Sequence, residues 1–103
     1  TINNMTKPEQ QEHFEKFSSQ MAEIMLSKGN DYAGHERLAN FRLVAQIAQI
    51  PVEKVFMVFL ATKIVRLGNL TSGGQPNCES INDSLLDNAN YSVLFDAYLN
   101  ELK

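Results

Sequence analysis

The chain has 103 residues, of which 44% are hydrophobic and 20% are charged, and 9 Lys and Arg against 12 Asp and Glu give a net charge of −3. These values exclude a disordered chain, argue against a coat for a nucleic-acid polymer, and fit one domain. The single cysteine excludes an internal disulfide and a cysteine-rich metal site. With a polar N-terminal segment and no apolar run of about 20 residues, the sequence predicts a cytoplasmic protein without a membrane span.

Apolar residues recur at three- and four-residue steps through most of the chain, and no period of two persists. This spacing predicts an all-α fold, a four-helix bundle in a single domain over 1–103. We expect the first helix to begin with a capping box at Thr6 and Glu9 and to end at Gly29. The four predicted helices cover about residues 8–28, 36–49, 52–67, and 77 or 80 to 102.

The start of the fourth helix has two alternatives. Ser80 and Asp83 fit a capping box, in which the Asp83 carboxylate would bind a backbone N–H group. If Asn77 is the cap instead, Glu79 lies in the first turn, where the helix dipole favours an acid. The sequence leaves both open.

The third predicted helix, 52–67, is apolar on nearly all sides. A helix of this kind is typical of the buried centre of a protein. Because the chain is small, burial on every side also predicts a partner subunit, so we expect a homo-oligomer, a dimer or tetramer.

Two cations interrupt this apolar helix. Lys63 and Arg66 fall on the same side as Val55 and Phe56, so they point inward or at an interface, where they need anions. The fourth helix offers a stripe of three acids spaced i, i+4, i+8, which it shares with one amide. These residues are Glu79, Asp83, Asp87 and Asn90.

Two explanations of these charges compete. In the structural one, Lys63 and Arg66 form salt bridges with Asp83 and Asp87 that hold the third and fourth helices together. In the functional one, the acids hold Mg²⁺ and the two cations clamp phosphates, as a nucleoside triphosphate requires.

A compact polar segment lies between the first two helices. It is either a plain turn or part of a binding site, in which Tyr32 stacks on a base while Lys28 and Asp31 meet polar groups. Asn40, slightly further on, either reads a base edge or caps the second helix.

The order of these stretches resembles a known group of proteins. The sequence contains K-G-N-D-Y (28–32), N-F (40–41), K-I-V-R-L (63–67) and E-S-I-N-D-S-L-L-D-N-A-N-Y (79–91). Over about residues 24–95 it resembles the nucleotide-modification-associated domains of phages and prophages, which look like distant relatives of the MazG-like all-α nucleotide pyrophosphatases. The resemblance implies a helical bundle, oligomerisation, nucleotide substrates and Mg²⁺-assisted cleavage between the α and β phosphates.

Three hypotheses follow. In the first, an enzyme, Glu79 and Asp83 are catalytic and hold Mg²⁺ with Asp87. The residues that would bind the substrate are Lys28, Asp31, Tyr32, Asn40, Lys63, Arg66 and Asn90. In the second, the protein binds or sequesters a nucleotide without cleaving it, because the Glu-Glu-x-x-Glu cluster of MazG-like enzymes is missing and the second acidic element is stretched to Glu79-x-x-x-Asp83. In the third, the chain is a structural helical module.

Overall fold

The computed structural model describes residues 4–31, 38–75 and 79–103. These residues form four helices and no strand, which confirms the predicted all-α fold. The helices are α1 (Lys7–Asp31), α2 (Ala39–Ala48), α3 (Val52–Thr71) and α4 (Ile81–Glu101).

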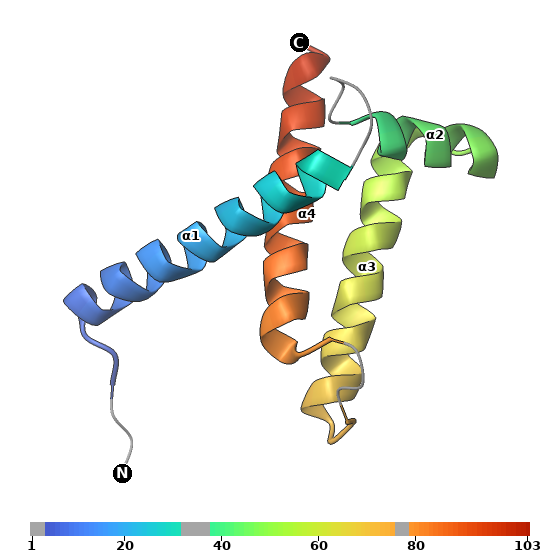
Figure 1. The fold of residues 1–103 in the computed structure, drawn as a ribbon. Helices are drawn as coiled ribbons and strands as arrows, with labels where there is room; N and C mark the ends of the chain where they lie inside the picture. Colours follow the sequence, from blue (N-terminus) through green and yellow to red (C-terminus); the bar gives the residue numbers. More distant parts are fainter. Residues whose placement is uncertain (1–3, 32–37, 76–78) are drawn as a thin grey trace.

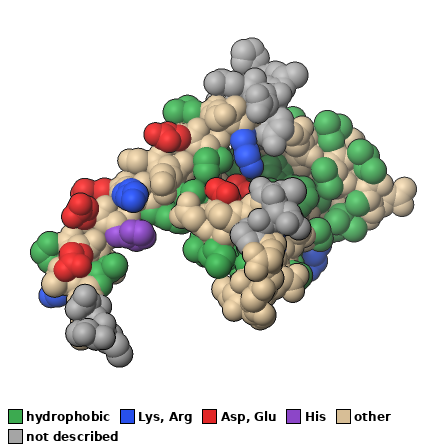
Figure 2. Space-filling model, turned by 60° about the horizontal axis from the view of Figure 1, so that its bottom comes forward, with side chains coloured by type: hydrophobic (Ala, Val, Ile, Leu, Met, Phe, Trp, Pro, Cys, Tyr) green, Lys and Arg blue, Asp and Glu red, His purple; other side chains and the backbone are tan. Residues whose placement is uncertain are grey.

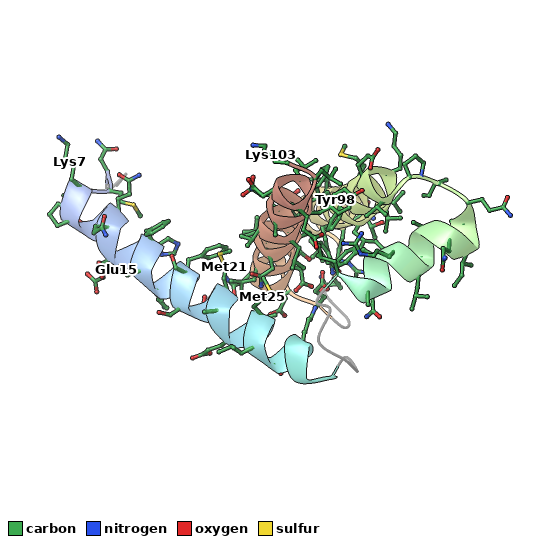
Figure 3. The ribbon with its side chains drawn as sticks, turned by 90° about the horizontal axis from the view of Figure 1, so that it is seen from above. Lys7, Glu15, Met21, Met25, Tyr98 and Lys103 are labelled. Carbon is green, nitrogen blue, oxygen red and sulfur yellow. The ribbon has the colours of Figure 1, made fainter. Side chains whose placement is uncertain are left out.

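The centre of the fold is the antiparallel pair of α3 and α4 (Figure 1). Helix α2 crosses the N-terminal end of α3, and the chain bends by 98° between these two helices. Among the described helices, α1 contacts only α4, through its C-terminal half, and its N-terminal half projects away from the other helices (Figures 1 and 3). The molecule therefore measures 52 × 30 × 26 Å.

Aromatic rings fill the core where α2, α3 and α4 meet. Phe56 of α3 is fully buried and stacks between Phe41 of α2 and Phe95 of α4, with ring centroids 4.3 and 4.9 Å away. The Tyr98 ring completes this group at 5.9 Å from Phe56. Rings at these separations attract one another beyond the burial of their area, so this end of the α3–α4 pair is well packed.

The ends of α1 and α3 differ in part from the predictions. The Glu9 N–H donates to Thr6 Oγ1 at 3.3 Å, which confirms Thr6 as a cap. Gly29 does not end α1, which continues to Asp31, and α3 passes through Gly68 to Thr71. A glycine weakens a helix by about 1 kcal/mol relative to alanine. It typically ends a helix where its backbone is left-handed, and neither Gly29 nor Gly68 has that conformation.

The start of α4 is settled by its local hydrogen bonds. The Asp83 N–H donates to Ser80 Oγ at 3.0 Å, and the Ser80 N–H donates to Asp83 Oδ2 at 3.2 Å. This reciprocal pair is a capping box, so Ser80 is the cap and the alternative start at Asn77 is wrong. Glu79 consequently lies one residue outside the helix.

Helix α3 is not buried on all sides within one chain. Only Val55 and Phe56 are buried in it, and Met57, Val58, Ile64 and Val65 are each more than half exposed. The expectation of a buried central helix is therefore wrong for the single chain. The all-round apolar pattern could not show this, because it does not say how many neighbours the chain itself supplies.

Within the described residues, no single helix is both long and apolar enough to cross a membrane. Only α2 and α3 taken together reach that length and composition, and they meet at a sharp bend.

Candidate functional site

Charged side chains from three helices converge beside the N-terminal end of α4. They come from α1, from α3 and from the residues at the start of α4, which the antiparallel α3–α4 pair brings together (Figure 1). We call this group the Lys63 cluster. Its members are Lys28, Lys63, Arg66, Glu79, Ser84 and Asp87.

Lys63 is the centre of the cluster. Its side chain is only 12% exposed, and its Nζ lies 2.7 Å from Glu79 Oε1 and 2.9 Å from Asp87 Oδ2. These two carboxylates are 17% and 14% exposed. The prediction that Lys63 points inward is therefore confirmed, and a single ammonium joins two largely buried acids.

Glu79 owes its position to the helix cap. Because the chain is extended at Ser80, the Glu79 side chain can fold back over the first turn of α4, where the fully buried Ser84 donates its hydroxyl to Oε2. Arg66 lies one helical turn after Lys63 and places Nε 3.2 Å from the same oxygen. Glu79 thus accepts from, or pairs with, three side chains at once.

The charges in the cluster shift two pKa values in opposite directions. Burial alone would raise the pKa of the Glu79 carboxyl, but hydrogen bonds from Lys63 and Ser84 and the charges of Lys63 and Arg66 hold it below its ordinary value. Burial would likewise lower the pKa of Lys63, but its bonds to Glu79 and Asp87 raise it. Both residues are therefore charged at neutral pH.

The rim of the cluster is more open than its centre. Lys28 of α1 reaches Asp87 Oδ1 at 3.5 Å and is 50% exposed, while Arg66 is 44% exposed. Apart from Nε, the guanidinium of Arg66 has no ion pair or hydrogen bond with the described residues. A shallow, open depression on α1 is lined by Glu23, Ile24, Ser27 and Lys28. The rim thus presents cations to a ligand from solvent.

The three acids that were predicted to hold Mg²⁺ lie in different surroundings. The acids do not share one helical stripe, because Glu79 precedes α4, and the Asp83 carboxylate is exposed and bound to the Ser80 N–H. Among the residues that the structure describes, no group of three His, Cys, Asp or Glu is placed to hold a metal ion. The two remaining carboxylates, Glu79 and Asp87, are already bridged by Lys63. Mg²⁺ binding by these acids stays a prediction.

The structural prediction for the ion pairs is half correct. Lys63 does pair with Asp87, but its other partner is Glu79 rather than Asp83, and Arg66 pairs with Glu79. Ser84, which sequence reasoning missed, is a buried hydrogen-bond donor to the Glu79 carboxylate. Its position three residues before Asp87, on the same face of α4, was the available signal.

The other predicted binding residues lie apart from the cluster or outside the described part. Asn90 is buried and donates Nδ2 to the Met21 carbonyl of α1 at 3.2 Å, so it ties α1 to α4. Asn40 is exposed in the first turn of α2 and does not cap it, because the cap position is Leu38. Tyr32 and the Asp31 side chain lie outside the described residues.

Figure 2 shows acidic and basic side chains meeting near the middle of one face, with hydrophobic side chains spread around them. Comparisons of the chain with family models, with curated proteins and with solved structures find no match. The resemblance to nucleotide-modification-associated and MazG-like proteins therefore stays a prediction, and the function is argued from the geometry of the Lys63 cluster.

Proposed function

We propose that this protein binds a nucleotide through its phosphates at the Lys63 cluster and does not cleave it. The observation that carries the proposal is the excess of cations. Lys28, Lys63 and Arg66 converge on two carboxylates, Glu79 and Asp87, which leaves one positive charge uncompensated among these residues at neutral pH. An anion supplied by a ligand would balance it.

In this proposal the centre of the Lys63 cluster positions the acids, and its rim binds the ligand. Lys63 is fixed by two acids, so it positions Glu79 and Asp87 rather than moving toward a ligand. Glu79 in turn holds Arg66 by Nε, which leaves the two terminal nitrogens of the planar guanidinium to donate to a phosphate. Lys28, whose 3.5 Å contact to Asp87 is the longest in the cluster, adds a second exposed cation.

The nucleotide class rests on the sequence pattern as well as on the cluster. The stretch that resembles nucleotide-handling proteins includes Tyr32, expected to stack on a base, four residues after Lys28. Phosphate recognition by Arg66 and Lys28 together with stacking by Tyr32 is a combination suited to a nucleotide.

A thermal-shift screen of nucleoside mono-, di- and triphosphates in the presence of EDTA tests the proposal. A ligand that binds the folded state raises the melting temperature in a saturable way, by mass action. We expect this rise for the wild type and for Lys54→Gln, an exposed lysine of α3 outside the cluster, and its loss in Arg66→Gln. If no nucleotide raises the melting temperature at millimolar concentration, the cluster is a set of structural ion pairs.

A Mg²⁺-assisted nucleoside triphosphate pyrophosphohydrolase is the second candidate. One observation favours it: Glu79 and Asp87 lie within reach of a single cation, which in this arrangement is the ammonium of Lys63. Assay of pyrophosphate release with Mg²⁺ distinguishes the two candidates. Turnover that disappears in Asp87→Asn supports the enzyme, whereas recovery of intact ligand supports binding alone.

A further inference from the structure

The chain exposes far more surface than a compact monomer does. Its accessible surface is 7786 Å², whereas a compact protein of 11.6 kDa is expected to expose about 5800 Å². Its radius of gyration is 16.1 Å, against about 13 Å for a compact domain of this length. The excess of about 2000 Å² is more than twice the roughly 800 Å² that each partner buries in an interface of standard size.

One continuous part of this surface lies on the outer side of α3. Met57, Val58, Ile64 and Val65 are 51–64% exposed, and Ala61 and Gly68 between them are also exposed. We call these six residues the α3 stripe. None of the six residues is charged: Lys63 and Arg66 of α3 point to the opposite side, toward α4, and Lys54, on the same side of the helix, lies one turn before the stripe begins. Neither α1 nor any other described part of the chain covers it, since α1 contacts only α4.

The stripe has the spacing of a helix–helix seam. Met57, Ala61, Ile64 and Gly68 follow one another at steps of four, three and four residues, the pattern of positions that face a second helix in a coiled coil. Gly68 strengthens this argument. A helix with glycine in its interior is less stable by about 1 kcal/mol than the same helix with alanine. Within the single chain there is room for alanine at position 68, because a Cβ there would meet nothing within 4 Å. Close approach of another helix gives the missing reason for a glycine here.

The sizes of the four seam residues favour a second, antiparallel copy of α3 as the partner. If two copies of α3 pack antiparallel about a twofold axis near residues 62 and 63, each large side chain meets a small one. Met57 then faces Gly68 of the second copy, and Ile64 faces Ala61. Parallel packing would instead set Met57 on Met57 and Gly68 on Gly68. Facing positions that alternate large and small fill space well, and a twofold contact requires one patch to complement itself.

We propose that the α3 stripe is the interface between two copies of this chain, packed antiparallel with Met57 on Gly68 and Ile64 on Ala61. The proposal does not depend on nucleotide binding, because the stripe lies on the side of α3 away from the Lys63 cluster. It specifies how one part of the uncovered surface of the chain is buried.

Sedimentation velocity of the wild type and of two matched variants tests the interface. Ile64→Glu places a charge in the seam and is expected to yield monomers. Ile47→Glu places the same charge on α2, at an isoleucine that is 83% exposed and outside the stripe, and is expected to remain associated. A wild type that is monomeric at micromolar concentrations, or one that associates equally in both variants, overturns the proposal. So does a monomeric wild type that floats with phospholipid vesicles, because the stripe then covers a membrane.

Cysteine cross-linking tests the antiparallel register even if Ile64→Glu fails to fold. In a Cys78→Ser background, Met57→Cys and Gly68→Cys are prepared as separate proteins and then oxidised alone or mixed. We expect a disulfide-linked dimer only in the mixture, because the two 57 positions lie about 16 Å apart along antiparallel helices. Cross-linking of Met57→Cys with itself, or no cross-link in any sample, contradicts the proposed packing.

Discussion

The two ends of the α3–α4 pair are held together by different chemistry. At one end Phe56 stacks between Phe41 and Phe95, and the only charged side chain that the described contacts place against these rings or Tyr98 is the partly exposed Arg42, over the Tyr98 ring. At the other end Lys63 joins Glu79 and Asp87, and all three are largely buried. Helix α2 covers the aromatic end, whereas Lys28 of α1 reaches the charged end.

The two ends are therefore expected to contribute differently to stability and to ligand binding. Burial of aromatic rings stabilises a fold at any pH and depends little on salt. Burial of charges gains little, because desolvation offsets most of the attraction between them. We therefore assign most of the stability to the aromatic end and ligand binding to the charged end, and each prediction below compares the two.

The largest effect is expected at the aromatic end. Phe56→Ala removes the ring that both neighbours stack on, and truncation of a fully buried phenylalanine destabilises a protein by about 3–5 kcal/mol. The control is Phe14→Ala on α1, where the ring is 65% exposed and the change is expected to stay within about 0.5 kcal/mol. Urea unfolding measures both. A loss below about 1 kcal/mol for Phe56→Ala would mean that the core lies elsewhere.

A smaller effect is expected at the centre of the charged end. Lys63→Met keeps an unbranched side chain that is one atom shorter but leaves Glu79 and Asp87 without their shared cation. Because the acids are not completely buried, we expect a loss of about 2 kcal/mol. The matched variant Lys54→Met, at an exposed position of the same helix, is expected to change stability by less than about 0.5 kcal/mol. Equal stability of the two variants would contradict the structural role of Lys63.

The cap that sets the position of Glu79 contributes less still. Ser80→Ala removes the acceptor of the Asp83 N–H, and loss of a serine cap costs about 1 kcal/mol. Ser80→Asp supplies another acceptor and is expected to restore most of it. Thermal unfolding compares the three proteins. If Ser80→Asp is as unstable as Ser80→Ala, the loss does not come from the cap.

The smallest difference is expected in the dependence of stability on pH. Because the pKa of Glu79 is lower in the folded state than in the unfolded chain, its contribution is complete above the ordinary carboxyl pKa of about 4.3 and is lost as the pH falls below it. The raised pKa of Lys63 acts at the other limit, and its contribution is lost only above a pH of about 10.4. Unfolding of Glu79→Gln measured from neutral to acidic pH should show a shallower decline than that of the wild type. Parallel curves would contradict the pKa direction of Glu79.

Features that depend on residues a few positions apart could be predicted from the sequence. The inward side of Lys63 follows from spacing within one helix and is confirmed, and the Ser80 and Asp83 capping box is one of the two starts of α4 that the sequence allows. The partners of Lys63 could not be derived in the same way. They depend on which residue begins α4, since that choice turns Asp83 toward the backbone and leaves Glu79 free to fold back.

Features that depend on the neighbours of a helix were beyond sequence reasoning. The apolar pattern of α3 shows that it needs cover on all sides, but not that α1 would pack on α4 and leave the α3 stripe exposed. Asn90 illustrates the same limit. Its place on the acidic side of α4 indicated a ligand contact, whereas its amide binds the Met21 carbonyl of α1.

The central claim, that the rim of the Lys63 cluster binds phosphate, is tested most directly by isothermal titration calorimetry with the tightest nucleotide from the thermal-shift screen, in EDTA. Arg66→Gln and Lys54→Gln each remove one positive charge from α3, so they match in net charge and differ in whether the cluster is touched. We expect Kd to rise about ten-fold or more in Arg66→Gln, because a charge-assisted hydrogen bond is lost, and about two-fold at most in Lys54→Gln. Equal weakening in both variants would contradict it, because binding would then reflect overall charge and not the cluster.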